Sequence, residues 1–348
     1  MLNTSISVMR LECAFRNALK PQKAPNMTSH KVVASKAGGP EVLELVPMSI
    51  PAPGPGQLLV KVAATGINFI ETYRRAGVYA VDYPFVPGSE CAGTVEALGE
   101  GVTGFDIGDR VATMWGKQTY ATHTLIESSK AVPVPAGVPL ETAGAMMSQG
   151  ITAHYLVNSC YEVKAGDTVL IHAGAGGVGR LLIQMSKLRG ATVFATTSTP
   201  AKAGIARAAG ADYVLNYEDV PTSVRELTDG RGVDVVFDGV GKDTFDGSLA
   251  SLKVRGTMVL FGGSSGPVPP VQLQRLNTHG SLYVTRPKTG DYLRTDEERL
   301  WRTTEVFDLV AAGKLDIHIG SRFPLAQAAA AHAALEARAT TGKTILVP

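Results

Sequence analysis

The chain is poor in cysteine, and this limits the disulfide and metal sites that it can form. Only three cysteines occur among 348 residues, Cys13, Cys91 and Cys160. Their number is odd, they are widely spaced, and no two form a C-x-x-C pair. The pattern argues against a disulfide framework and against a four-cysteine zinc lobe, and it is typical of a protein from a reducing compartment. We therefore expect a cytoplasmic protein.

The chain also lacks an excess of charge of either sign. It has 33 Lys and Arg against 31 Asp and Glu, and only 18% of its residues are charged. Such a balance gives no electrostatic attraction to nucleic acid or to an anionic membrane. No apolar run reaches the length of a membrane-spanning helix. We expect a globular protein, long enough for two domains, that acts on a small molecule.

The first 27 residues differ in composition from the rest of the chain. Four basic residues face a single acid, Glu12, and Met27 could itself be an initiator. A basic, acid-poor segment fits a mitochondrial presequence, and it also fits a disordered extension or an early start codon. We predict an N-terminal extension over residues 1–27, with mitochondrial targeting as the alternative to a cytoplasmic location.

The sequence TVLIHAGAGGVG over residues 168–179 is the most informative stretch. Its apolar start predicts a buried strand, and an apolar-periodic segment that ends at Gly190 predicts a helix. Between them, Gly174, Gly176 and Gly179 keep G-x-G-x-x-G spacing. In this order the glycines permit a tight turn, approach of backbone N–H groups to a pyrophosphate, and close packing of helix on strand. The sequence therefore predicts a dinucleotide site, although a ligand-free strand-to-helix turn uses the same residues.

The residues after the next predicted strand, Thr192–Thr196, indicate which dinucleotide binds. A site that prefers NAD usually has Asp or Glu there for the ribose hydroxyls. This chain has Thr197, Ser198 and Thr199, followed by Lys202. Hydroxyls and a cation can bind a 2′-phosphate, and no carboxylate repels it. We predict NADPH as the cofactor.

The order of predicted elements indicates an α/β protein with two domains. Residues 30–134 contain short β runs separated by Gly and Pro turns, which is typical of a barrel-like β domain. Strands and helices alternate over residues 151–285, which predicts parallel βαβ units. Two helices, at 297–312 and 325–338, and a strand at 344–347 follow. We predict a Rossmann doubly wound parallel sheet over residues 150–287, inserted into a β-barrel domain of residues 28–149 and 288–348.

Several separated motifs support a family resemblance. They are GINFIETY at residues 66–73, HAGAGGVG at 172–179, NY at 216–217, FGGSSG at 261–266, SLYVTRP at 281–287 and EARAT at 336–340. From about residue 30 onward the chain resembles the medium-chain dehydrogenase/reductase superfamily, and within it the zinc-independent NADPH:quinone oxidoreductases of the ζ-crystallin-like branch. The resemblance implies a GroES-like catalytic domain, a Rossmann domain and a homodimer.

The resemblance also implies roles for individual residues. Asn68, Tyr73 and Tyr79 are expected to form the catalytic face, where an amide and two phenols can bind the nicotinamide carboxamide and an acceptor carbonyl. For each tyrosine, a packing role is the alternative. The expected cofactor contacts are Thr152, Gly174, Gly176, Gly177, Val178, Gly179, Ser198, Lys202, Tyr217, Asp238, Phe261, Gly262, Arg286 and Arg338. Gln149 replaces a lysine that is common in close relatives, and this leaves its role open.

The sequence predicts no metal site. Zinc alcohol dehydrogenases of the same architecture carry cysteine where this chain has Asn68, and Gly-His-Glu where it has residues 88–90, GSE. Cysteine and histidine are the ligands that zinc prefers, and the remaining histidines show no ligand spacing. Without a Lewis acid to polarise an alcohol, the chemistry is expected to run toward reduction of an electron-poor acceptor.

The predicted function is metal-free reduction of a quinone by NADPH. An alkenal, enone or enoyl-thioester reductase would use the same residues, and the sequence does not separate these acceptors. A structural or RNA-binding protein that retains an NADPH site is the alternative from another class. The sequence also leaves open the proton donor and whether electrons pass singly or as a hydride.

Overall fold

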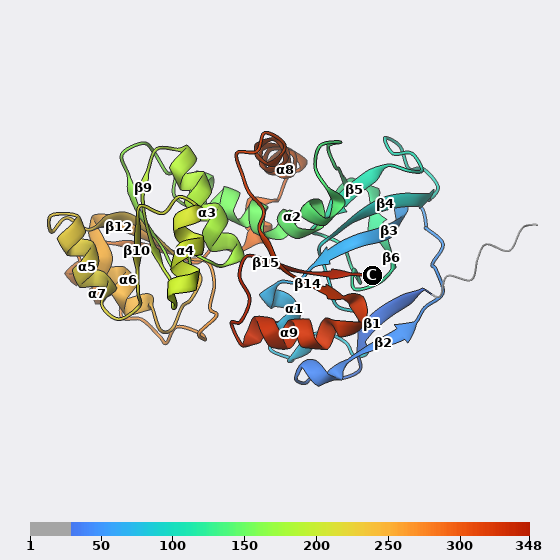
Figure 1. Cartoon of the computed structure of the whole chain (residues 1–348), viewed down its shortest axis with the longest axis horizontal. Helices are drawn as coiled ribbons and strands as arrows, with labels where there is room; N and C mark the ends of the chain where they lie inside the picture. The colour runs from blue at the N-terminus through green and yellow to red at the C-terminus, as the bar shows by residue number, and fades with distance from the viewer. Residues whose placement is uncertain (1–28) are drawn as a thin grey trace, which may run out of the picture.

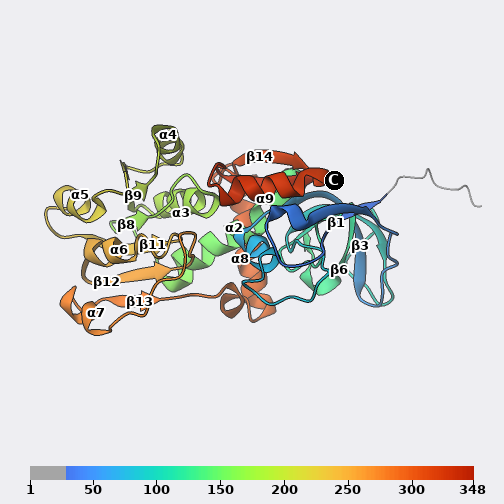
Figure 2. The same ribbon diagram turned by 90° about the horizontal axis from the view of Figure 1, so that it is seen from below.

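The computed structural model describes residues 29–348, and the predicted extension over residues 1–27 lies outside them. Figures 1 and 2 show two lobes with helix α2 between them. Each lobe contains one large sheet. No helix among the described residues is both long enough and apolar enough to cross a membrane.

The first lobe is a six-stranded parallel sheet in the order β10-β9-β8-β11-β12-β13. Its strands are β8 (Thr168–Ile171), β9 (Thr192–Thr196), β10 (Tyr213–Leu215), β11 (Val233–Asp238), β12 (Leu252–Leu260) and β13 (Tyr283–Thr285). The helices are α3 (Gly177–Leu188), α4 (Pro200–Ala208), α5 (Val220–Leu227), α6 (Phe245–Ser251) and α7 (Gln274–Thr278). The strand order reverses at β8, which places a ligand crevice at the carboxyl ends of β8 and its neighbours. The predicted Rossmann sheet is confirmed.

The central strands of this sheet owe their position to continuous apolar sequence. Val169, Leu170 and Ile171 are fully buried, as are all six residues of β11 to within a few per cent. A parallel sheet covered by helices on both faces requires such runs, because neither face meets water. Figure 2 shows helices on both sides of the β8–β12 region.

The second lobe contains a seven-stranded sheet, with β6 paired to β3 beside the path β14-β15-β3-β4-β5-β7. Its strands are β3 (Gln57–Gly66), β4 (Cys91–Leu98), β5 (Arg110–Thr113), β6 (His123–Glu127), β7 (Val132–Pro133), β14 (Ile319–Pro324) and β15 (Lys343–Val347). A separate pair joins β1 (His30–Ala34) and β2 (Leu43–Pro47). The helices outside the Rossmann sheet are α1 (Phe69–Arg75), α2 (Leu140–Tyr155), α8 (Asp296–Ala311) and α9 (Ala328–Glu336). Because β14 and β15 return to β3, the predicted insertion of one domain into the other is confirmed.

Helix α2 joins the two sheets without a break. It packs on β3 in one lobe and on α3 in the other, so the predicted boundary between residues 149 and 150 lies inside a continuous helix. The helix passes into a π-helical turn, Leu156–Cys160. The predicted helix over 325–338 is shorter than expected, because a 3-10 turn (Leu325–Gln327) precedes α9.

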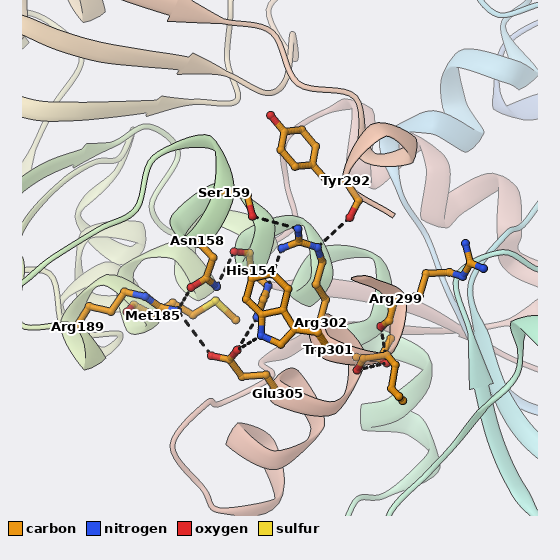
Figure 3. A network of polar contacts seen from close by, with 12 residues as sticks. His154, Asn158, Ser159, Met185, Arg189, Tyr292, Arg299, Trp301, Arg302 and Glu305 are labelled. Atoms are coloured by element: carbon orange, nitrogen blue, oxygen red, sulfur yellow. Dashed lines mark hydrogen bonds and ion pairs between the residues drawn. The ribbon is translucent and has the colours of Figure 1, made fainter. Parts of the chain in front are cut away.

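A buried polar network fixes the C-terminal end of α2 (Figure 3). Nε2 of His154 lies 2.8 Å from Oε2 of Glu305 on α8, and Nδ1 accepts from Nη1 of Arg302 at 3.2 Å. Arg302 also donates to Oγ of Ser159 and to the backbone oxygen of Tyr292. Burial lowers the pKa of His154, with Glu305 partly opposing. The network ties α8 to the end of the helix that carries Gln149 and Thr152.

Candidate active site

A cleft of about 1,380 Å³ is lined by residues of both lobes. Most of the predicted site residues meet there, although they come from sequence positions 68 to 338. From the second lobe come Asn68, Tyr73 and Tyr79, and from α2 comes Thr152. From the Rossmann side come Gly176, Gly177, Val178, Gly179, Ser198, Lys202, Tyr217, Phe261, Gly262 and Arg286, and Arg338 closes the set. Gly174 and Asp238 do not line it.

The glycine loop is shaped by a close approach of two backbone segments and by a residue in a left-handed conformation. Gly176 is the N-cap of α3, and a Cβ on Gly179 would lie 2.3 Å from the backbone oxygen of Ala173. Ala173 itself has a φ of 55°, a left-handed conformation that is costly for a residue with a side chain. The turn leaves the N-terminus of a twelve-residue helix facing the cleft. Free N–H groups and the helix dipole at this point fit a pyrophosphate.

Gly174 has a different role from the one expected. A Cβ there would lie 2.8 Å from Cβ of Ala195 on β9 and 3.3 Å from Cδ1 of Ile183 on α3. The residue therefore permits α3 to pack against the sheet. Its absence from the cleft lining is consistent with this packing role.

Two cations meet at one end of the cleft. Nζ of Lys202 donates to the backbone oxygen of Arg338 at 3.0 Å, and Nη2 of Arg338 donates to the backbone oxygen of Ser264 at 3.1 Å. Arg338 has a φ of 55° just after α9, which turns the chain toward the Rossmann lobe. Ser198 and Tyr217 line the same cleft. Two cations beside hydroxyl groups fit a 2′-phosphate dianion.

Asp238 lies beneath the cleft and is fully buried. Its carboxylate accepts from the backbone N–H groups of Val240 and Gly241 and from the hydroxyls of Thr244 and Ser248. These bonds shape the loop that follows β11. Of these three expected cofactor contacts, Phe261 and Gly262 line the cleft and Asp238 supports the backbone below it.

The other end of the cleft carries the three predicted catalytic residues. Asn68 is the N-cap of α1, where it forms a reciprocal capping box with Glu71. Tyr73 follows on the same helix and meets the ring of Tyr79 edge-on at 5.7 Å. Burial raises the pKa of Tyr73, Tyr79 adds to the shift, and the guanidinium of Arg286 partly offsets it. Tyr79 is half exposed.

Gln149 on α2 contacts the glycine loop. A Cβ on Gly177 would lie only 2.0 Å from its Oε1, so glycine is needed for this approach. The cleft is also lined by residues to which no sequence motif pointed, namely Arg74, Met114, Ser148 and Lys288. Ser89 lines it too, and its place in the GSE segment was the one available signal.

Asn68 is held from behind by three charged side chains to which the sequence motifs assigned no role. Glu71, Glu90 and Lys343 are each at most 1% exposed. In the sequence, Lys343 is noticeable because it begins an otherwise apolar strand. Burial raises the pKa of Glu71, while the hydroxyl of Ser89 and the ammonium of Lys343 lower it in part.

The described residues contain no group of three His, Cys, Asp or Glu side chains close enough to hold a metal ion. Asn68 and Ser89 lie near each other through their shared contacts with Glu71. Catalysis without a metal stays a prediction.

The fold and the cleft define a medium-chain dehydrogenase/reductase, with a Rossmann domain inserted into a GroES-like domain. Two family profiles match: the alcohol dehydrogenase GroES-like domain over residues 54–163 and the zinc-binding dehydrogenase family over residues 209–346. A quinone oxidoreductase from Pseudomonas aeruginosa is 46% identical over 315 residues, which cover 89% of this chain and 97% of that protein. The chain belongs to the quinone oxidoreductase family.

A solved structure and a further relative extend the comparison. The crystal structure of Escherichia coli quinone oxidoreductase complexed with NADPH matches with a TM-score of 0.89 at 41% identity, over 92% of this chain and all of that one. A 2-haloacrylate reductase from a Burkholderia species is 39% identical over 326 residues, which cover 91% of this chain and 98% of that protein.

Proposed function

We propose that the protein reduces quinones with NADPH and without a metal ion. The observation that carries this proposal is one continuous cleft with a glycine-loop helix N-terminus in the middle, two cations at one end and Asn68, Tyr73 and Tyr79 at the other. A cleft of about 1,380 Å³ is large enough for a dinucleotide together with a small acceptor. The NADPH complex of the E. coli relative supports the choice of cofactor.

NADPH supplies the hydride when it is bound. Lys202 and Arg338 neutralise its 2′-phosphate, and the N-terminus of α3 binds its pyrophosphate. Asn68 donates from its amide to a carbonyl oxygen of the acceptor, where negative charge develops as the hydride arrives. Tyr73 and Tyr79 line the space in which the acceptor binds. Quinone, NADPH and one proton from solvent give hydroquinone and NADP⁺.

Reduction of an activated alkene is the second candidate, because the 2-haloacrylate reductase is a close relative. There the hydride would add to the β-carbon, and the same amide would stabilise the enolate oxygen. Three acceptors, one quinone and two activated alkenes, distinguish the candidates in one assay. We expect NADPH oxidation, followed at 340 nm, to be fast with 1,4-benzoquinone and slow with 2-chloroacrylate and an alkenal. Turnover of the alkenes alone would replace the proposal by the second candidate.

NADPH binding without turnover of any of these acceptors would instead favour the binding-protein alternative. Activity that is lost on treatment with EDTA and restored by zinc would contradict the metal-free part of the proposal.

We also propose a homodimer in a reducing, cytoplasmic setting. Strand β13 is an edge of the Rossmann sheet, and Tyr283 and Val284 on it are 63% and 38% exposed. A second copy that adds its own β13 would cover this edge. Cys91 and Cys160 are free thiols, and burial raises the pKa of Cys91 strongly, which suits a protein kept reduced.

A further inference from the structure

A buried ion pair lies directly behind Asn68. Nζ of Lys343 lies 2.6 Å from Oε2 of Glu90, and both residues are at most 1% exposed. The same ammonium donates to Oδ1 of Asn68 at 2.7 Å. Nδ2 of Asn68 donates in turn to Oε2 of Glu90 at 2.9 Å. One amide therefore spans both charges of the pair.

This arrangement permits only one orientation of the Asn68 amide. After a flip, the amide NH₂ would face the ammonium and the amide oxygen would face the carboxylate, so both contacts would become repulsive. Electrostatic interactions are strong where water is excluded, and the preference is correspondingly large. In the observed orientation one Nδ2 hydrogen is used by Glu90. The other has no acceptor among residues 29–348, and Asn68 lines the cleft.

The surrounding backbone accommodates the Lys343–Glu90 pair. Oε1 of Glu90 accepts from the backbone N–H of Ser148 on α2 at 2.8 Å. A Cβ on Gly66 would lie 2.4 Å from Oε2 of Glu90 and 2.7 Å from Cε of Lys343, so glycine at this position leaves the necessary space. Because desolvation offsets most of the attraction in a buried ion pair, stability is a weak reason for its presence.

The pair also lies next to the two positions at which zinc dehydrogenases of this architecture carry ligands. Those positions are Asn68 and Ser89 here. Oγ of Ser89 donates to Oε1 of Glu71 at 2.8 Å, and Oε2 of Glu71 accepts from the backbone N–H of Asn68 at 2.9 Å. The buried cation beside them in this chain is the ammonium of Lys343.

We propose that Lys343, paired with Glu90, is a positioning residue that acts on the acceptor through Asn68. The ammonium draws electron density from Oδ1 and so strengthens the remaining Nδ2–H as a donor, while Glu90 holds that hydrogen toward the cleft. As hydride reaches the acceptor, this donor stabilises the charge that develops on the acceptor oxygen. The inference rests on the proposed function, because it requires Asn68 to contact the acceptor.

The test compares neutralisation of the pair with removal of the amide. The variants are Lys343→Met combined with Glu90→Gln, Asn68→Ala, and the triple variant. We expect the pair variant to lower kcat with 1,4-benzoquinone by about tenfold or more, with the Kd for NADPH within about threefold of wild type. Asn68→Ala should lower kcat at least as much. The triple variant should be no slower than Asn68→Ala, since the pair acts only through the amide.

Two further variants separate positioning from stability. Lys253→Met with Asp234→Asn neutralises an ion pair of the Rossmann lobe, in which Asp234 is 2% exposed, and should leave kcat unchanged. Gly66→Ala displaces the Lys343–Glu90 pair without removing its charges, so it tests the proposal even if the neutralised variant does not fold. It should lower kcat in the same way as the pair variant.

The outcomes distinguish a failure of the role of Asn68 from a failure of the role of Lys343 alone. If Asn68→Ala turns over quinone as fast as wild type, the amide has no role and both the site assignment and this inference fail. If Asn68→Ala is slow while both pair variants keep wild-type kcat, only the role of Lys343 is overturned. Multiplicative losses in the triple variant would also overturn it, because they would mean that the pair acts independently of Asn68.

Discussion

Lys202 and Arg338 are 136 residues apart, yet the ammonium of one donates to the backbone oxygen of the other. This contact concentrates positive charge where the proposed 2′-phosphate lies. Lys202→Glu would replace attraction by repulsion for NADPH, whereas NADH carries no phosphate there. We expect kcat/KM for NADPH to fall about 10- to 100-fold and that for NADH to change little.

The matched control is Lys314→Glu, which makes the same charge change at an exposed lysine outside the cleft. Steady-state kinetics with NADPH and with NADH give the ratio of their kcat/KM values for each variant. An unaltered NADPH/NADH preference in Lys202→Glu would show that the phosphate binds elsewhere.

Glu71 makes the stability of the protein depend on pH. Burial raises its pKa in the folded protein above the unfolded value. The protonated form is therefore favoured by folding: its contribution is fully present below the unfolded pKa and is lost as pH rises through the folded pKa. Glu71→Gln mimics the protonated form at every pH. We expect its free energy of unfolding, relative to wild type, to be higher at pH 8 than at pH 4.5, as measured by urea denaturation. A difference that stays constant over this range would contradict the argument.

Helices and strands with a clear local sequence pattern are predictable from the sequence. The strand at 192–196 has the predicted bounds, because it is a short apolar run that is followed by polar residues. Helix α2 was not predicted as an element. Its Gly144 and Gly150 weaken the helical pattern, and they are explained only by tertiary contacts with Ala64 and Val306.

Arg302 connects α8 to the end of α2, and its removal should be costly. Its side chain is 2% exposed and donates to His154, Ser159 and the backbone of Tyr292. Arg302→Ala leaves these acceptors without a donor in a buried place, so we expect a loss of about 3 kcal/mol in the free energy of unfolding.

Arg299 on the same helix is the control. Its side chain is 29% exposed and pairs with Asp296, so Arg299→Ala should cost less than about 1 kcal/mol. Urea denaturation of both variants measures the difference. Equal losses would mean that the buried contacts of Arg302 in Figure 3 contribute no more than the exposed pair of Arg299.

At the scale of the whole molecule, the site is predictable where one segment carries a motif and unpredictable where distant segments meet. The glycine loop and Lys202 follow from local sequence, whereas Arg338 was expected only from the family resemblance. The contact between Lys343 and Asn68 joins residues 275 positions apart, and no local pattern indicates it. Asp238 shows the same limit: it was expected to contact the cofactor, but its burial beside Thr244 and Ser248 depends on how the following loop folds.

The proposed dimer would form through an exposed apolar edge of the Rossmann sheet. Val254, Leu273, Tyr283 and Val284 are exposed apolar residues in the β12–β13 region, and β13 has a partner strand on one side only. Two copies related by a twofold axis would bring the same strand together and pair their free N–H and C=O groups. Tyr283→Lys with Val284→Lys would place like charges near that axis and so oppose the pairing.

We expect the wild-type protein to have twice the monomer mass in light scattering coupled to gel filtration, and the double-lysine variant to have the monomer mass. Tyr283 and Val284 do not line the cleft, so NADPH binding by the variant tests whether the monomer is intact. Lysines at Leu188 and Leu227, which are exposed apolar residues on α3 and α5, provide the control and should leave the dimer in place. A monomeric wild type, or a double-lysine variant that remains dimeric, would rule out β13 as the interface.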